Sequence, residues 1–282
     1  MVTPAFVPPA RACDAHLHAF GSRSEYPLIA NLRDEPPIAT VEQCMELGAS
    51  LGLERIVFVQ PSGYGTDNRC QLDAAAAMGL DRARVVVALE DDVSEAELEP
   101  LSDRGVCGIR INVSPVEPYR PELIPDVAEQ VRLMESHCRR LGWHLDFLFP
   151  DWLTSAFMPE FRKLQVPYTI AHLGMNRADA GVEAQGFQDL LELMSSGDRN
   201  CWVKFTASYR ISQDAGYQDV VPMAQAAVQS ASDRVLWGTD YPHLGFVGED
   251  SVVHFNLLKD AAPDEADRTR ILVTNPEELY GF

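Results

Sequence analysis

The chain has 282 residues, 46% hydrophobic and 23% charged, and its 42 acidic against 23 basic side chains give a formal net charge of -19. That balance argues against a nucleic-acid partner, whose phosphates require a basic surface, and no apolar stretch approaches the ~20 residues that cross a bilayer. The six cysteines are scattered and form no CxxC pair, and the N-terminal residues show no signal-peptide pattern. Both observations indicate a cytoplasmic protein with reduced thiols. We expect residues 1–282 to form one domain.

Short apolar runs rich in β-branched residues alternate with helical patterns along the chain. The expected strands cover residues 12–18, 55–60, 85–90, 108–113, 144–149, 168–172, 202–206 and 235–239. Amphipathic stretches such as 40–51, 71–78, 94–103 and 123–141 predict helices, and capping-box patterns begin at Thr40 and Ser94. Repeated strand–helix units predict a parallel sheet, and eight of them over this length predict a (β/α)8 barrel of the TIM type.

The main competing fold is an open, doubly wound sheet, which binds phosphate at a glycine-rich turn after an early strand. Gly63 and Gly65 begin such a pattern, but the helix-packing glycine that should follow is missing. The sequence therefore favours the closed barrel. In a closed barrel the C-terminal ends of all strands meet at one rim, where active sites are built.

The first expected strand ends in two histidines separated by one residue, His16 and His18, shortly after Asp14. Side chains of a strand alternate between its two faces, so His16 and His18 point the same way and can both face the barrel mouth. Imidazoles at that position can bind a ligand or donate hydrogen bonds. One packed and one solvated histidine at a strand end is the alternative interpretation.

Polar and cationic residues follow three other expected strands. Ser62 and Tyr64 lie in a polar loop after the second strand and can hydrogen-bond a ligand. Arg110 lies inside the fourth strand, where a charge is unexpected unless it points into the mouth, and Arg210 follows the seventh. Guanidinium groups pair bidentately with carboxylates, so two arginines at one rim indicate an anionic substrate. Salt bridges that only stabilise the fold are the alternative.

The sixth and eighth expected strands supply the remaining candidates. His172 ends the sixth strand and can polarise a carbonyl or orient water. Asp240 emerges from the eighth strand after Gly238, a residue that lets neighbouring chain approach closely. A carboxylate near imidazoles is placed to take a proton from water, and we expect His243 to support it. A turn-forming role is the alternative for Asp240.

Together these motifs resemble a known family. The segments DAHLH (residues 14–18), AHLG (171–174), WGTDYPH (237–243) and NPEELYGF (275–282) resemble the amidohydrolase superfamily, and within it the subgroup of 2-pyrone-4,6-dicarboxylate lactonase and related lactonases. The resemblance implies a distorted (β/α)8 barrel that opens a small anionic lactone. The candidates are a 2-pyrone-4,6-dicarboxylate-like, a muconolactone-like or a sugar-acid lactone, and hence a role in the catabolism of aromatic compounds or sugar acids.

The resemblance also implies a role for each site residue. Asp240 is implied to be the general base that directs water onto the lactone carbonyl. The three histidines His16, His18 and His172 are implied to polarise the carbonyl oxygen. The two arginines named above are implied to hold a substrate carboxylate.

Metal content follows less directly from the resemblance. The wider superfamily commonly binds divalent ions, whereas the pyrone-type lactonases work without them. Here the fourth expected strand carries no lysine, and the fifth ends in Leu148-Phe149-Pro150 with no histidine at that end, so we favour no metal cofactor. If Zn2+ is bound, the expected ligands are His16, His18, His172 and Asp240.

Three alternatives to a lactone hydrolase remain open. The first is a zinc-dependent decarboxylase of the same superfamily, which stoichiometric zinc and release of carbon dioxide would favour. The second is a lactone isomerase. The third is a non-catalytic binding protein, which would bind a ligand without converting it. The sequence does not indicate the oligomeric state. The pyrone-lactonase pattern has a further basic residue after the fourth-strand segment and a tyrosine in the fifth strand, whereas this chain reads INVSP (residues 111–115) and LDFL (145–148) there, which leaves the exact lactone open.

Overall fold

The computed structural model describes residues 2–30, 32–197 and 199–282, and its strands form one parallel sheet in the order β1 to β8. The strands are β1 (Cys13–Leu17), β2 (Arg55–Val59), β3 (Ala83–Val87), β4 (Val106–Asn112), β5 (His144–Leu148), β6 (Tyr168–Ile170), β7 (Cys201–Phe205) and β8 (Val235–Trp237). All eight predicted strands are confirmed, although β3 and β4 begin two residues earlier than predicted, and β3, β6 and β8 end two or three residues earlier. The predicted (β/α)8 barrel is therefore the observed fold.

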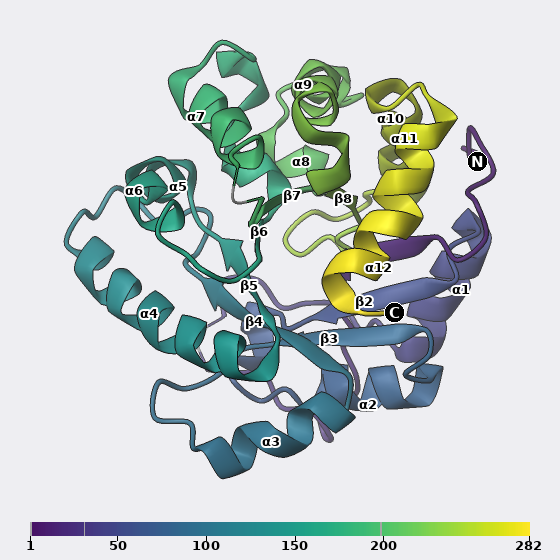
Figure 1. The fold of residues 1–282 in the computed structure, drawn as a ribbon. Coiled ribbons are helices and arrows are strands. Elements are labelled where there is room, and N and C mark those ends of the chain that lie inside the picture. Colours follow the sequence, from purple (N-terminus) through teal and green to yellow (C-terminus); the bar gives the residue numbers. More distant parts are fainter. Residues whose placement is uncertain (1, 31, 198) are drawn as a thin grey trace.

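Helices surround the strands on the outside (Figure 1). They are α1 (Val41–Leu51), α2 (Arg69–Met78), α3 (Glu95–Asp103), α4 (Leu123–Leu141), α5 (Asp151–Ala156), α6 (Met158–Phe161), α7 (Gln185–Met194), α8 (Ser208–Ile211), α9 (Val221–Ala231), α10 (Ser251–Ala261), α11 (Glu265–Thr269) and α12 (Asn275–Tyr280). The four predicted helices correspond to α1–α4, and both predicted capping boxes form. Within the described ranges, no helix is long and apolar enough to span a membrane.

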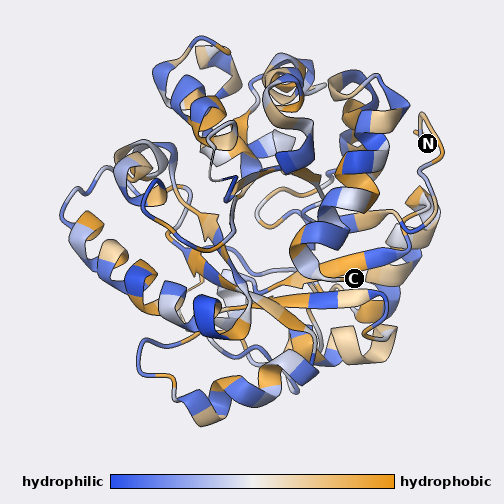
Figure 2. Cartoon of the chain, viewed as in Figure 1, coloured by the Kyte–Doolittle hydropathy of each residue, from blue (hydrophilic) through white to orange (hydrophobic). Residues whose placement is uncertain are grey.

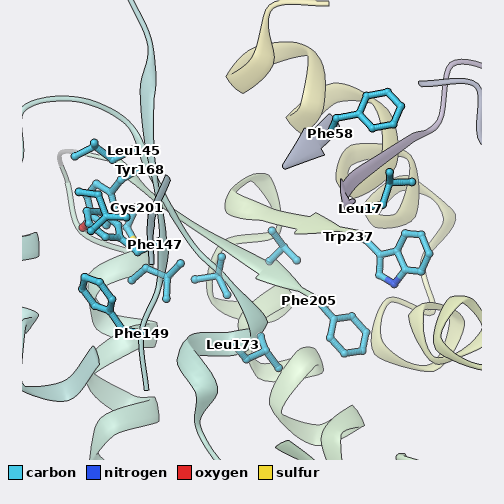
Figure 3. Packing of buried hydrophobic residues seen from close by; sticks show 14 of the residues in the cluster. Leu17, Phe58, Leu145, Phe147, Phe149, Tyr168, Leu173, Cys201, Phe205 and Trp237 are labelled. Carbon is cyan, nitrogen blue, oxygen red and sulfur yellow. The ribbon is translucent and has the colours of Figure 1, made fainter. Parts of the chain in front are cut away.

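The core lies mainly between the strands and the helices. Strands are largely hydrophobic in Figure 2, whereas the helices alternate between hydrophobic and hydrophilic residues. Figure 3 shows the buried contacts on two sides of the barrel, with Leu17, Phe58 and Trp237 on one side and Phe147 and Tyr168 on the other. Burial of such side chains contributes roughly 1.5–3 kcal/mol each and sets the barrel's shape.

The C-terminal segment closes the end of the barrel opposite the strand C-termini. Helix α12 lies beside β2 (Figure 1), and Arg55 of β2 pairs with Glu277 of α12 at 3.1 Å. Tyr280 packs in a buried cluster with the interior side chains Cys13 and Val57. The floor of the barrel is therefore filled, and any ligand must enter from the other end.

Strand register places several polar side chains inside the barrel. Arg110 pairs with Asp146, and Asp146 pairs with Thr169. Trp202 also pairs with Thr169, and Lys204 follows Trp202 by two residues, which places it on the same face. Arg110, Asp146, Thr169 and Lys204 are all buried. The barrel therefore holds a polar layer above its apolar floor.

The sheet closes between β8 and β1 through the segment that follows β8. The Asp240 amide donates to the His16 carbonyl oxygen at 2.8 Å, and the His18 amide donates to the Tyr241 carbonyl oxygen at 2.8 Å. These two backbone hydrogen bonds fix Asp240 directly beside the two histidines of the first strand.

The Asp14 carboxylate and Gly238 allow this close approach. Asp14 accepts hydrogen bonds from the His16 amide (3.0 Å), the Thr239 amide (3.1 Å) and the Thr239 hydroxyl (2.6 Å). A Cβ atom on Gly238 would lie 2.6 Å from the His16 nitrogen and 2.8 Å from Asp14 Oδ1. The prediction that Gly238 lets the neighbouring chain approach closely is therefore confirmed.

Candidate active site

Three histidines converge on one carboxylate oxygen at the barrel mouth. Asp240 Oδ1 lies 3.3 Å from His16 Nε2 and 3.4 Å from His18 Nε2. His172 Nε2 lies 3.9 Å from the same oxygen, and all four side chains are buried. The structure thus brings together the four residues that the sequence selects as candidate catalytic groups, although they are up to 224 positions apart (240 minus 16).

Two of these residues adopt left-handed backbone conformations that residues other than glycine seldom take. The φ angle is +54° at His172 and +57° at Asp240. Such conformations carry strain and persist where the surrounding structure determines them, commonly at functional sites. His172 begins a 3-10 turn, His172–Met175, directly after β6, which explains why that strand is shorter than predicted.

The second oxygen of Asp240 is held by the loop that follows β7. Tyr209 donates its hydroxyl hydrogen to Asp240 Oδ2, and Arg210 Nε lies 3.6 Å from the same oxygen. Burial favours the neutral carboxyl, but the three histidines and Arg210 outweigh it and hold the pKa of Asp240 well below its usual range. Asp240 is therefore ionised at neutral pH, with Oδ2 engaged and Oδ1 facing the histidines.

The hydrogen-bond partners of the imidazoles indicate where the ring protons lie. His16 Nδ1 is 3.3 Å from the Lys204 ammonium, which has only donors, so the neutral ring carries its proton on Nε2. His18 Nδ1 is 2.7 Å from the Val59 carbonyl oxygen, which only accepts, so Nδ1 donates and Nε2 of the neutral ring has a lone pair. His16 and His18 therefore present opposite hydrogen-bonding characters to Asp240.

A buried ion pair lies beneath the histidines. Lys204 donates to Asp146 Oδ2, which also accepts the Thr169 hydroxyl hydrogen at 2.7 Å, and Arg110 Nε lies 3.9 Å from Asp146 Oδ1. Burial disfavours the charged form of Asp146, but Lys204 and Arg110 outweigh it and hold its pKa well below the usual range. Lys204 is not among the site residues predicted from the sequence, although it is a charged residue in the middle of an apolar strand, the same signal that selects Arg110.

A pocket of about 310 Å³ opens at the C-terminal ends of the strands. Its walls include six of the eight candidate site residues, together with polar residues of β4 and the loop after it: His18, Ser62, Arg110, Asn112, Ser114, His172, Arg210 and Asp240. His16 lies directly behind Asp240. The structure does not bring Tyr64 to the pocket, since its hydroxyl accepts from the Gly21 amide at 3.2 Å and its ring packs against Phe20.

His243 contacts Asp240 directly, because its backbone amide donates to the Asp240 carbonyl oxygen at 2.9 Å, and its side chain contacts Tyr209. Its Nε2 atom is 2.9 Å from the Ser251 hydroxyl, and its ring meets the Tyr209 ring edge-on with centroids 5.4 Å apart. Burial lowers the pKa of His243 to about 4, so the ring is neutral. His243 therefore supports Asp240 in two ways: its amide holds the Asp240 carbonyl oxygen, and its ring packs against Tyr209, a residue that carries no distinctive sequence signal.

Ligand atoms of His16, His172 and Asp240 lie within 4.8 Å of one another, so these residues could hold a metal ion. His18, the fourth ligand that the sequence suggests, is not part of this group. A zinc ligand must offer a lone pair on the coordinating nitrogen. On His16 that would place the ring proton on Nδ1, against the Lys204 ammonium 3.3 Å away. The donor set therefore does not fit a metal ion at His16.

Comparison with known proteins gives consistent matches over nearly the whole chain. The family model described as Amidohydrolase matches residues 13–282. The 4-sulfomuconolactone hydrolase of Hydrogenophaga intermedia is 36% identical over 281 residues, which cover 98% of this chain and 90% of that protein. The 2-pyrone-4,6-dicarboxylate hydrolase of Comamonas testosteroni is 34% identical over 292 residues, covering 98% and 92%. An apo crystal structure from Agrobacterium tumefaciens superposes with a TM-score of 0.85 at 26% identity, covering 99% of each chain.

Proposed function

Because the chain belongs to the amidohydrolase family, we propose that it hydrolyses the ring ester of a small anionic lactone. The observation that carries this proposal is the convergence of three imidazoles on an ionised Asp240 at the base of a 310 Å³ pocket. The relatives named above are hydrolases of two unsaturated lactones with carboxylate or sulfonate groups. We take lactones of that class as the substrate, and the catabolism of aromatic compounds or sugar acids as the setting.

Asp240 acts as the general base in this proposal. Its Oδ1 atom takes a proton from water while the water oxygen bonds to the lactone carbonyl carbon. Tyr209 and Arg210 hold Oδ2, so the carboxylate cannot rotate away from the histidines. A carboxyl group with a depressed pKa is a strong acid once protonated, so Asp240 can return that proton to the ring oxygen as the ester C–O bond breaks.

The oxyanion that forms on the carbonyl oxygen needs hydrogen-bond donors. His16 does not itself line the pocket, but its Nε2 atom carries a proton 3.3 Å from Asp240 Oδ1, and we take it as the donor of the neutral state. His172 becomes a second donor when the Thr206 hydroxyl, 2.7 Å from its Nδ1 atom, donates to that atom, because the ring proton of the neutral imidazole is then on Nε2. His18 donates from Nε2 only when doubly protonated. Removing one such donor typically lowers kcat by ~100- to 1,000-fold.

Arg110 is the main anchor for the substrate carboxylate in this proposal. It lines the pocket, and one of its terminal nitrogens donates to the Gln60 carbonyl oxygen at 2.9 Å. Arg210 also lines the pocket but contacts Asp240 and donates to the Leu244 carbonyl oxygen at 2.9 Å. Arg210 therefore divides its donors between the base and the ligand, and Ser62 adds a hydroxyl at the rim.

We propose that this reaction proceeds without a metal ion. The support is the Lys204 ammonium beside His16, which opposes metal coordination there. Water is then activated by Asp240 rather than by a bound cation. For the compartment we propose the cytoplasm, since no disulfide joins cysteines in the described parts of the chain.

The test is turnover of a lactone panel by chelator-treated protein, with 2-pyrone-4,6-dicarboxylate and 4-sulfomuconolactone included. Mass spectrometry distinguishes hydrolysis, which adds one water, from isomerisation, which leaves the mass unchanged, and decarboxylation, which releases carbon dioxide. We expect a water-addition product whose rate survives chelation. Asp240→Asn should lower kcat by at least ~100-fold with little change in substrate binding. Near-normal turnover by this variant would remove Asp240 from the mechanism.

A further inference from the structure

Lys204 lies in the middle of β7, and its side chain is completely buried inside the barrel. Its ammonium nitrogen meets two groups, Asp146 Oδ2 and His16 Nδ1, the latter at 3.3 Å. It does not line the pocket. Because Lys204 contacts the Nδ1 atom of His16, on the opposite side of the ring from Asp240, it can act on the site through that imidazole.

We propose that Lys204 is a positioning residue that fixes the ring proton of His16 on Nε2, which makes His16 a hydrogen-bond donor at Asp240 and keeps divalent metal ions off that nitrogen. An ammonium group offers three donors and no acceptor, so the nitrogen facing it must accept. The other ring nitrogen then carries the proton, and it lies 3.3 Å from Asp240 Oδ1.

Burial lowers the pKa of Lys204, and the Asp146 carboxylate beside it opposes that shift and favours the ammonium form. A lone ammonium inside a protein is unfavourable, but a buried ion pair persists where further hydrogen bonds satisfy both partners. Asp146 supplies the opposite charge and is itself hydrogen-bonded by the Thr169 hydroxyl at 2.7 Å. The pair is thus built into β5, β6 and β7, and the Lys204 ammonium is held against His16 by the sheet itself.

The consequence for metal binding follows from the same geometry. A metal ion on His16 Nε2 needs the lone pair of that nitrogen, and the ring proton must then move to Nδ1. On Nδ1 the proton would point at an ammonium hydrogen, and the metal would add a second positive charge nearby. Replacement of Lys204 by an uncharged side chain removes both obstacles and leaves His16, His172 and Asp240 as a potential zinc site.

The proton position can be measured on the unaltered protein. NMR of protein labelled with 15N-histidine distinguishes the two ring tautomers, and a His16→Gln variant identifies the His16 signals among those of the seven histidines. We expect the proton on Nε2 of His16. A proton on Nδ1 would overturn the proposal without any reference to turnover.

The second measurement is zinc affinity by titration calorimetry. Lys204→Met should bind Zn2+ at least ~10-fold more tightly than the unaltered protein, which is about 1.4 kcal/mol. Adding His16→Gln should abolish the gain, and Thr169→Val, which weakens the same network without touching His16, should show none. Equal zinc affinity with and without Lys204 would refute the proposal. If Lys204→Met does not fold, Lys204→Met with Asp146→Asn removes both charges and serves in its place.

The donor role of His16 toward a lactone rests on the proposed function, whereas its tautomer and the zinc affinity do not. Lys204→Met should lower kcat by ~10-fold or more while KM changes by less than about twofold, because the displaced proton serves the transition state. If the tautomer and zinc results hold but no lactone is hydrolysed, the proposed function fails and the role of Lys204 at His16 stands.

Discussion

Replacing Gly238 tests whether the close approach of β1 and the segment after β8 is what aligns Asp240 with the histidines. An alanine Cβ at this position would lie 2.6 Å from the His16 nitrogen, 2.8 Å from Asp14 Oδ1 and 2.9 Å from His16 Cβ. Carbon contacts are ordinarily ~3.5–4.0 Å, so β1 and the segment after β8 must separate by roughly 1 Å. None of the three atoms is the free end of a flexible side chain, since the Asp14 carboxylate is held by hydrogen bonds.

The structure sets the size of the effect. Overpacking a core lowers the free energy of unfolding by ~1–3 kcal/mol, and three hydrogen bonds to Asp14, each with a net value of about 1 kcal/mol, lie in the strained region. We expect Gly238→Ala to destabilise the protein by about 3 kcal/mol, or roughly 5 °C in Tm for a chain of this length. A displacement of about 1 Å between Asp240 and His16 should lower kcat by ~100-fold.

The assay pairs thermal unfolding with turnover of the best lactone of the panel. Gly216→Ala is the matched control, because a Cβ there would meet only Asp214 Oδ2, at 3.9 Å. The control should keep its kcat and shift Tm by no more than about 1 °C. If Gly238→Ala behaves like Gly216→Ala in both measurements, the close approach of β1 and β8 does not position the site, and the reasoning is wrong.

Two further predictions concern Asp14 and Tyr209. Burial raises the pKa of Asp14 from 3.8 to about 7, so the folded state holds this proton more tightly than the unfolded state and stability falls as pH rises through that interval. The free energy of unfolding of the unaltered protein, measured in urea and compared with that of Asp14→Asn, should therefore fall by roughly 1 kcal/mol per pH unit between about pH 5 and 7. A difference between the two proteins that does not change with pH would contradict the assignment. Tyr209→Phe removes a hydrogen bond to a charged carboxylate and should lower kcat by roughly 10- to 100-fold with little change in KM, from a loss of about 1.5–3 kcal/mol. Tyr217→Phe, whose hydroxyl donates to Glu249 instead, is its control, and equal kcat values for the two variants would remove Tyr209 from the site.

The fold is largely predictable from the sequence because its strands are apolar, short and regularly spaced. The count of eight and the parallel order follow from that alternation. Strand ends are less predictable where the backbone leaves the sheet abruptly. The turn at His172 has φ of +54°, a conformation fixed by the contacts around it rather than by residue type. The short helices α5, α6 and α8 are likewise not delimited by periodicity, since each has only four to six residues.

The residues of the candidate site likewise divide into those that the sequence predicts and those that it does not. His16, His18, His172 and Asp240 are predictable because a barrel brings all strand ends to one rim, whatever their separation in sequence. Tyr209 is not, because its direction depends on the left-handed turn at Ala207, where φ is +50°.

Tyr64 is predicted at the site but lies outside the pocket, whereas Lys204 is not predicted but lies beside His16. Tyr64 lies in a loop of the right polarity but turns toward Phe20, and loop composition does not fix side-chain direction. Lys204 is buried in an apolar strand, and only the register of β5, β6 and β7 places its partner Asp146 beside it. A charged residue inside a predicted barrel strand is therefore a useful signal in itself, because it requires a buried partner.

The same closure also explains how two carboxylates of one barrel differ in protonation. Asp14 accepts three hydrogen bonds but forms no ion pair with a cation among the described residues, and burial raises its pKa to about 7. Asp240, which follows the Asp14-bound Thr239 by one residue, has Arg210 3.6 Å from one oxygen and three imidazoles around the other, so its pKa is depressed despite equal burial. The hydrogen bonds from Thr239 and the His16 amide therefore do not offset the burial of Asp14, whereas the imidazoles together with Arg210 keep Asp240 ionised. An anionic lactone that pairs with Arg110 and Arg210 would draw on the Arg210 charge that also helps to keep Asp240 ready to accept a proton.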